Sequence, residues 1–161
     1  MALINLHVNG ENMSVDTEPD TPLVYVLRND FDFKGAKLGC ALEQCGACMV
    51  LVDGEPTNSC VRAAAEFEGR QIETVESFGN PEKMSDIQQI FAEENVAQCG
   101  YCTAGIVCSV TALFRKTRQP TDQQINYQKW SSEIHDLFGS LTGYATGCNG
   151  ISDGMCGGRF R

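Results

Sequence analysis

The sequence predicts an α+β fold in two parts, a strand-rich part over residues 1–77 and a helical part over residues 78–161. Before residue 80, apolar and polar residues alternate in short runs, which is the period of a half-buried strand. After residue 80, apolar residues recur at helical spacing. Hydrophobic residues make up 42% of the 161-residue chain, enough for one ordinary domain or two small ones.

A β-hairpin is predicted at the start of the chain. Residues 3–15 alternate around Asn9-Gly10, a dipeptide that favours the tightest hairpin turns. After Pro22, apolar residues at helical spacing predict one short helix within residues 23–31. Two antiparallel strands and a helix should therefore open the fold.

Two further strands complete the predicted first part. Residues 49–52 form an apolar run that ends at the turn Asp53-Gly54, where the chain reverses. Residues 71–75 are predicted to form a closing strand. The first part should thus be a compact unit of strands around one helix.

The second part is predicted to contain three helices. Residues 83–94 and 103–116 carry apolar residues on one face. Thr121 begins a sequence that resembles a capping box, so a third helix is predicted from there to residue 134 or 137. The Gly-rich segment after residue 138 is expected to be irregular. From about residue 126 the sequence is atypical of a helical domain.

The charge balance argues against a nucleic-acid partner. Twelve basic and 21 acidic residues give a net charge of −9, which would repel a phosphate backbone. The one basic run, residues 115–118, is interpreted as a solvated helix end. No segment reaches the roughly 20 apolar residues of a membrane span, and no signal peptide is evident. We therefore expect a protein or redox partner, no membrane insertion, and a cytoplasmic location.

Four cysteines have the spacing of a plant-type [2Fe–2S] ligand set. Cys40, Cys45 and Cys48 form C-x4-C-x2-C, and Cys60 follows. The chain has nine cysteines, so a complete set of internal disulfides is impossible. Gly39 and its neighbours would let backbone N–H groups approach the sulfides. The alternative is a zinc site, which usually draws on two separated C-x2-C pairs.

A second C-x2-C, formed by Cys99 and Cys102, stands just before the predicted helix at residue 103. Together, LGCALEQCGACMVLVDGEPTNSC and AQCGYCTAGIVCSVTALF resemble the small iron–sulfur subunits of the xanthine dehydrogenase family, or molybdenum hydroxylases. The resemblance covers roughly residues 1–125. Within the family, DTPLVYVLRNDF and QPTDQQI look most like bacterial enzymes of the nicotinate and isoquinoline dehydrogenase kind.

The resemblance implies a β-grasp, ferredoxin-like domain over residues 1–77 and an all-α helical-bundle domain over residues 78–161, each with a [2Fe–2S] cluster. It also implies a large molybdopterin-binding catalytic partner and a flavin or cytochrome acceptor subunit. The partner would oxidise an N-heteroaromatic compound or an aldehyde, and this non-catalytic chain would pass on the electrons. The amide of Gln98 would face the molybdopterin across the interface, or else cap a helix or face solvent.

The family takes two further ligands of the second cluster from a motif of the form GNLCRCTGY, which this chain lacks. The corresponding stretch is HDLFGSLTGYATGCNGISDGMC. Either Cys148 and Cys156 replace the missing pair, or the second cluster is absent or incomplete, or the C-terminal sequence is altered by a frame error. The rival functions are a free-standing ferredoxin or iron–sulfur sensor, and a zinc-stabilised interaction module.

Overall fold

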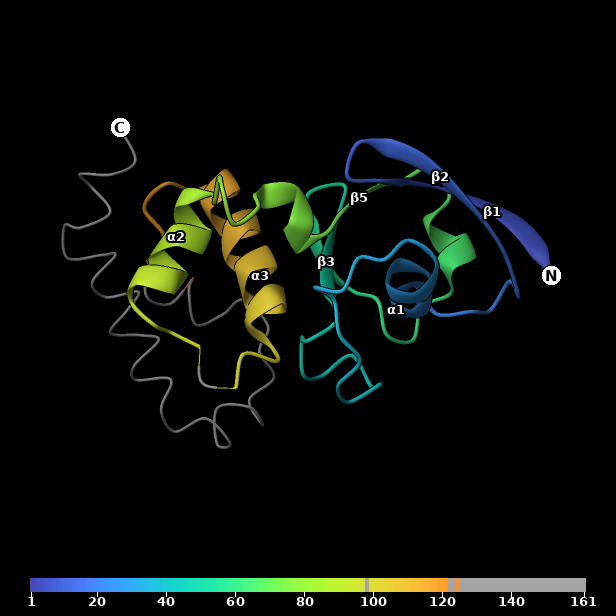
Figure 1. Cartoon of the computed structure of the whole chain (residues 1–161), viewed down its shortest axis with the longest axis horizontal. Coiled ribbons are helices and arrows are strands. Elements are labelled where there is room, and N and C mark those ends of the chain that lie inside the picture. The colour runs from blue at the N-terminus through green and yellow to red at the C-terminus, as the bar shows by residue number, and fades with distance from the viewer. Residues whose placement is uncertain (98, 122–123, 125–161) are drawn as a thin grey trace.

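The computed structural model describes residues 1–97, 99–121 and 124 (Figure 1). The predicted hairpin is confirmed: strand β1 (Ala2–Val8) pairs antiparallel with β2 (Glu11–Thr17). Asn9 and Gly10 both have positive φ angles, 53° and 88°, as the two central residues of a type I′ turn require. The twist of this turn matches the twist of the strands that it connects.

Five strands form one mixed sheet in the order β2-β1-β5-β3-β4. Strands β3 (Met49–Val52) and β4 (Glu55–Asn58) make a second hairpin, and β5 (Gln71–Glu73) lies parallel to β1 and antiparallel to β3. Strand β5 ends two residues earlier than the sequence predicts. Its continuation forms a 3-10 turn over Val75–Phe78 instead.

Helix α1 (Leu23–Tyr25) continues as a wider π-helical turn over Val26–Asp30. One core lies between this helix and the sheet. Its largest fully buried side chains come from strands and helix alike: Ile4, Leu6, Val8, Leu23, Val24, Val26, Leu27, Val50, Val52, Phe67 and Ile72. This arrangement of a mixed sheet curled around one helix is the predicted ferredoxin-like fold.

Strand β3 is buried on both faces. Val50 and Val52 point into the first core, whereas Met49 and Leu51 belong to a second core on the opposite face. Successive side chains of a strand point to opposite sides, so a strand covered twice has a continuous apolar sequence. The second core contains Cys108 from helix α3 (Thr103–Lys116), so the helical part packs directly on the sheet.

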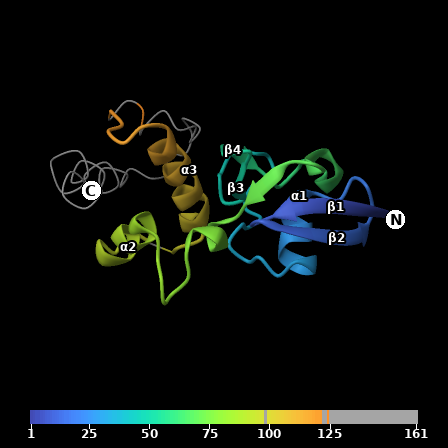
Figure 2. The same cartoon turned by 90° about the horizontal axis from the view of Figure 1, so that it is seen from above.

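The second part contains helices α2 (Asp86–Glu93) and α3, which lie beyond β3 from the β1–β2 hairpin (Figure 2). Helix α2 begins three residues later than predicted, at a capping box in which Ser85 accepts a hydrogen bond from the backbone N–H of Gln88. The bounds of α3 match the prediction. In the part of the chain that the structure describes, no helix has the length and apolarity of a membrane span.

The third predicted helix lies mostly outside the described residues. The capping box predicted at its start is confirmed, because Thr121 Oγ1 accepts from the N–H of Gln124 and the Gln124 side chain accepts from the N–H of Thr121. These hydrogen bonds satisfy N–H groups that a helix leaves unpaired at its first turn.

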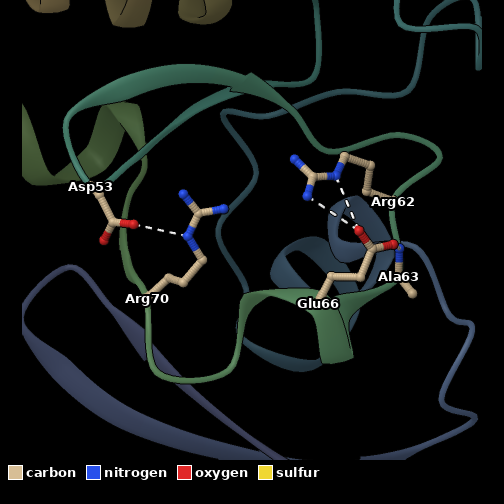
Figure 3. Close-up of polar contacts among 5 residues, drawn as sticks. All are labelled: Asp53, Arg62, Ala63, Glu66 and Arg70. Carbon is tan, nitrogen blue, oxygen red and sulfur yellow. Dashed lines mark hydrogen bonds and ion pairs between the residues drawn. The ribbon is translucent and has the colours of Figure 1, made fainter.

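Polar contacts fix the turns on the edge of the first part (Figure 3). Asp53, at the β3–β4 turn, accepts hydrogen bonds from the N–H of Gln71 and from Arg70 Nε, at 2.9 and 2.8 Å. Both bonds lower the pKa of the Asp53 carboxyl below its ordinary value. The contacts of Asp53 thus attach the turn of the β3–β4 hairpin to the start of β5. Figure 3 also shows Glu66, which pairs with Arg62 and accepts a hydrogen bond from the N–H of Ala63.

Candidate functional site

A loop between α1 and β3 carries three of the four cysteines of the first predicted ligand set. Within it, Ala41, Glu43 and Gly46 have positive φ angles of 54°, 58° and 67°. Non-glycine residues seldom adopt this conformation, and it costs free energy at each position. The loop is therefore held in a tight curl that turns its backbone N–H groups inward.

The inward N–H groups converge on one sulfur. Cys40 Sγ accepts from the N–H groups of Leu42, Gln44 and Cys45, each at 3.3 Å, and Cys45 Sγ accepts from the N–H of Cys40 at 3.3 Å. Burial raises the pKa of the Cys40 thiol, but the three N–H groups outweigh it and lower this pKa to about 7. The thiolate, the form that binds a metal, is thus stabilised by the loop itself.

Cys48 and Cys60 form a second pair, deeper in the fold. These two residues are 1% and 3% exposed. Burial, reinforced by the neighbouring Cys60, raises the pKa of Cys48 to about 12. A thiol in this environment ionises readily only when a cation compensates its charge, as a coordinated metal does.

Asn58 connects these cysteines to the loop. Its Nδ2 donates to the carbonyl oxygen of Glu43 at 2.9 Å, and its Oδ1 lies 3.6 Å from Cys48 Sγ. The next residue, Ser59, is fully buried and donates through Oγ to the carbonyl oxygen of Cys48 at 2.7 Å. Nothing in the sequence except closeness to Cys60 pointed to these two residues.

The packing of the loop leaves no room for an additional side chain at Gly39. A Cβ atom there would lie 2.5 Å from Cys45 Sγ. The glycine thus permits the backbone to pass directly against Cys45 Sγ, a close approach that the sequence predicts for a loop that hydrogen-bonds a cluster.

The four thiols are arranged as two pairs rather than as one group of four. Among residues 1–97, 99–121 and 124, no three His, Cys, Asp or Glu side chains converge on a point where a single ion could be held. A [2Fe–2S] cluster takes two thiolates on each of two irons, whereas structural zinc takes four ligands on one ion. Two pairs of thiols could supply two ligands to each of two irons.

The second cysteine loop precedes α3. Cys99 is exposed, Cys102 is partly buried at the N-cap of the helix, and Gly100 between them has a φ angle of 79°. Burial raises the pKa of Cys102, the charges of Cys99 and Cys45 raise it further, and the charge of Lys37 opposes them. Cys102 therefore lies near residues of the first loop. Figure 1 shows both loops, before β3 and before α3, on the same side of the molecule.

Several predicted residues lie outside the described part of the chain: Gln98, Cys148 and Cys156. Cys108 is fully buried in the second core, and burial raises the pKa of its thiol to about 12. It packs as a small apolar side chain and takes no part in either cysteine loop.

The predicted basic helix end is exposed at Arg115 and Lys116, in the last turn of α3, and both residues also pair with acidic residues of the sheet. Arg115 makes a bidentate ion pair with Glu73 at 2.7 and 2.9 Å, and Lys116 lies 2.6 Å from Glu55. Sequence spacing could not reveal these pairs, because each joins residues far apart in the chain.

Comparisons with known proteins identify both cysteine regions. A family model described as "2Fe-2S iron-sulfur cluster binding domain" matches residues 6–76, and one described as "[2Fe-2S] binding domain" matches residues 74–134. The nicotinate dehydrogenase small FeS subunit of Eubacterium barkeri is 41% identical to the chain over 122 residues, which cover 76% of this chain and 78% of the relative. A nicotinate dehydrogenase chain of Pseudomonas putida is 44% identical, with the same coverage.

Solved structures share the fold. Aldehyde oxidoreductase from Desulfovibrio desulfuricans matches 95% of this chain with a TM-score of 0.82 and 28% identity, although the match spans only 17% of that longer polypeptide. A chain of quinoline 2-oxidoreductase from Pseudomonas putida matches 92% of this chain and 97% of its own length, with a TM-score of 0.75 and 28% identity.

Proposed function

The chain belongs to the small iron–sulfur subunits of the molybdenum hydroxylase family, and we propose that it carries electrons from a large molybdopterin-binding partner to an external acceptor. The observation that carries this proposal is the pair of cysteine loops side by side, one at β3 and one at α3. As in its family, the chain serves electron transfer within an oxidoreductase and is not the catalytic component. The alternative of a free-standing ferredoxin is not favoured.

We propose that Cys40, Cys45, Cys48 and Cys60 hold the first cluster. The N–H groups around Cys40 favour its thiolate, and the glycine at position 39 lets the backbone approach the ligand sulfur of Cys45. A bound cluster supplies reversible one-electron chemistry. The surrounding residues hold it, exclude water from its buried side and provide the hydrogen bonds that tune its potential.

We propose that Cys99, Cys102, Cys148 and Cys156 hold the second cluster, and that the Gln98 amide faces the molybdopterin of the partner. The proposed boundary between the two domains lies between residues 77 and 78, within the 3-10 turn that follows β5.

The second cluster would receive electrons from the partner, and the first would deliver them to a flavin or cytochrome subunit. The acidic surface would orient these docking partners.

An N-heteroaromatic compound is the proposed substrate of the assembly, with an aldehyde as the second candidate. Nicotinate dehydrogenase and quinoline 2-oxidoreductase are named for compounds of the first kind, and aldehyde oxidoreductase for the second. The cytoplasm is the proposed compartment, because thiols at short, regular spacing act as metal ligands in a reducing environment. Co-export with a partner that has a signal peptide is the alternative.

The experiment is anaerobic addition of substrate to the chain purified with its large partner. Nicotinate, quinoline and benzaldehyde are added separately, and the visible bleaching and EPR signals of the clusters are recorded. We expect an N-heteroaromatic compound to reduce the clusters in the complex and to leave them oxidised in the small chain alone. Reduction of the small chain without the partner would contradict the proposal.

A further inference from the structure

The tip of the first cysteine loop, residues 41–44, is not held in place by burial. All four of these residues are exposed, and Glu43 has a positive φ angle of 58°. Such an angle costs free energy in a residue other than glycine, so it persists only where other contacts hold the backbone. The tip nevertheless carries two of the N–H groups that reach Cys40 Sγ, those of Leu42 and Gln44.

Contacts with other elements fix the loop on either side of its tip. Before the tip, the hydroxyl of Tyr101 donates a hydrogen bond to the carbonyl oxygen of Leu38 at 2.5 Å. After the tip, Gly46 lies directly against α3, since a Cβ atom on Gly105 would be 2.0 Å from the Gly46 carbonyl oxygen. Neither contact reaches residues 41–44, so the conformation of the tip needs a contact of its own.

Asn58 supplies such a contact. Its Nδ2 donates a hydrogen bond to the carbonyl oxygen of Glu43 at 2.9 Å. This carbonyl and the N–H of Gln44 belong to one planar peptide unit, in which they point in opposite directions. An amide that holds the carbonyl oxygen on one side therefore holds the N–H on the other side, where it donates to Cys40 Sγ at 3.3 Å.

The sheet fixes the position of Asn58 itself. Asn58 is the last residue of β4 and pairs with Met49 of β3. The next residue, Ser59, is fully buried, donates to the carbonyl oxygen of Cys48 and accepts a hydrogen bond from the N–H of Val24 at 2.9 Å. The Asn58 amide thus extends from a firmly packed part of the fold to a strained and exposed one.

We propose that Asn58 is a positioning residue that keeps the Gln44 N–H on Cys40 Sγ and thereby raises the reduction potential of the first cluster. The inference rests on the proposed function. Reduction adds one electron to the cluster, and no bond or proton changes place; the molybdopterin partner supplies the electron, and the external acceptor removes it. An N–H donor stabilises the added negative charge, so its loss makes reduction less favourable.

A direct effect of the Asn58 side chain on the cluster would have the opposite sign. Its Oδ1 lies 3.6 Å from Cys48 Sγ. This oxygen is the negative end of the amide dipole, so its removal from beside a ligand sulfur would make reduction easier and raise the potential. The direction of the shift therefore separates an effect through the loop from a direct one.

The test is Asn58→Leu in the complex with the large partner, which keeps the branched shape of the side chain and removes its donor and its acceptor. A redox titration follows the EPR signal of the first cluster, identified as the signal that Cys45→Ser lacks. Amide hydrogen exchange over residues 40–48 is measured by mass spectrometry. We expect the ratio of reduced to oxidised first cluster at a fixed potential to fall several-fold, and exchange in the loop to become several-fold faster.

Asn5→Leu is the matched control, because it makes the same chemical change at an exposed asparagine of β1 whose amide contacts Ser14. It should alter neither the potential nor the exchange rate. Asn58→Ser is the second variant, because its shorter side chain does not extend to the Glu43 carbonyl. The potential of the first cluster should shift in the same direction as in Asn58→Leu.

An unchanged or raised potential in Asn58→Leu would overturn the inference, and so would a lowered potential without faster exchange in the loop. Loss of the first cluster from both Asn58 variants would overturn it too, because Asn58 would then be needed for binding rather than for the potential. The absence of any [2Fe–2S] signal from the unmodified complex would overturn the proposed function as well, which distinguishes the two failures.

Discussion

At Cys40, three backbone N–H groups converge on one sulfur, and they do so because the loop accepts positive φ angles at Ala41 and Glu43. The spacing of the cysteines predicts that a ligand set lies here, since C-x4-C-x2-C places three thiols in one turn of chain, and whether they bind iron stays a prediction. The spacing could not predict Asn58 or Tyr101, whose contacts depend on how β4 and α3 meet the loop. These contacts are tertiary and leave no periodic trace in the sequence.

Replacement of one proposed ligand tests the first cluster. Cys45→Ser should remove one of the two EPR signals and about half of the iron, because a [2Fe–2S] cluster needs four ligands. The matched control is Cys108→Ala, which removes a thiol from the second core. The Cys108→Ala protein should keep both EPR signals, and its free energy of unfolding should fall by about 1 kcal/mol. Full iron content in Cys45→Ser would remove this residue from the ligand set.

Lys37 places a positive charge close to Cys102, and it anchors itself by donating from Nζ to the carbonyl oxygen of Gly35 at 2.9 Å. A nearby cation stabilises the added electron. Lys37→Gln should therefore lower the reduction potential of the second cluster, by an amount on the order of tens of millivolts. The measurement is a redox titration followed by EPR.

Lys34→Gln serves as the control for Lys37, because Lys34 is largely exposed and pairs with Asp32. In Lys34→Gln, the reduction potential of the second cluster should match that in the unmodified protein. Equal shifts in both variants would indicate a general effect of net charge rather than a local one.

Among the elements, α3 shows both the power and the limit of prediction from sequence. Its apolar period predicted its bounds, Thr103–Lys116, because one face had to be buried. The sequence did not reveal what that face covers, which is the Met49 and Leu51 side of β3. Strand β5 was predicted too long, because Thr74 and Val75 are β-branched residues of the kind that is common in strands, although the chain turns there.

The ion pair at the end of α3 is the contact most open to a stability test. Arg115 pairs with both carboxylate oxygens of Glu73, and its guanidinium lies 5.4 Å from the centre of the Phe78 ring. The Arg115 and Glu73 side chains are 47% and 31% exposed, so solvent screens the pair. Arg115→Ala should lower the free energy of unfolding by about 1 kcal/mol, measured by urea denaturation.

Lys116→Ala is the matched control, because the Lys116 and Glu55 side chains are more exposed, at 53% and 60%. Its effect should be smaller than that of Arg115→Ala. Equal effects would show that the bidentate geometry and the ring contact at Arg115 add no stability.

For the molecule as a whole, β3 determines how the two parts are joined. Its two faces complete two cores, so the sheet and the helical part share one strand. The α+β class and the order of its parts followed from a change in hydrophobic period near residue 80. The shared strand did not, because the period of a continuous apolar run such as Met49–Val52 does not distinguish a fully buried strand from a buried helix segment, and it does not say which elements cover it.

The central claim is that this chain holds two [2Fe–2S] clusters in a relay. The most direct measurement is iron and acid-labile sulfide per chain, with EPR of the dithionite-reduced protein, on material purified anaerobically with its partner. The account predicts about four iron atoms and two distinct rhombic signals. Two irons and one signal would leave only Cys40, Cys45, Cys48 and Cys60 as ligands and break the relay, and zinc without iron would contradict the account entirely.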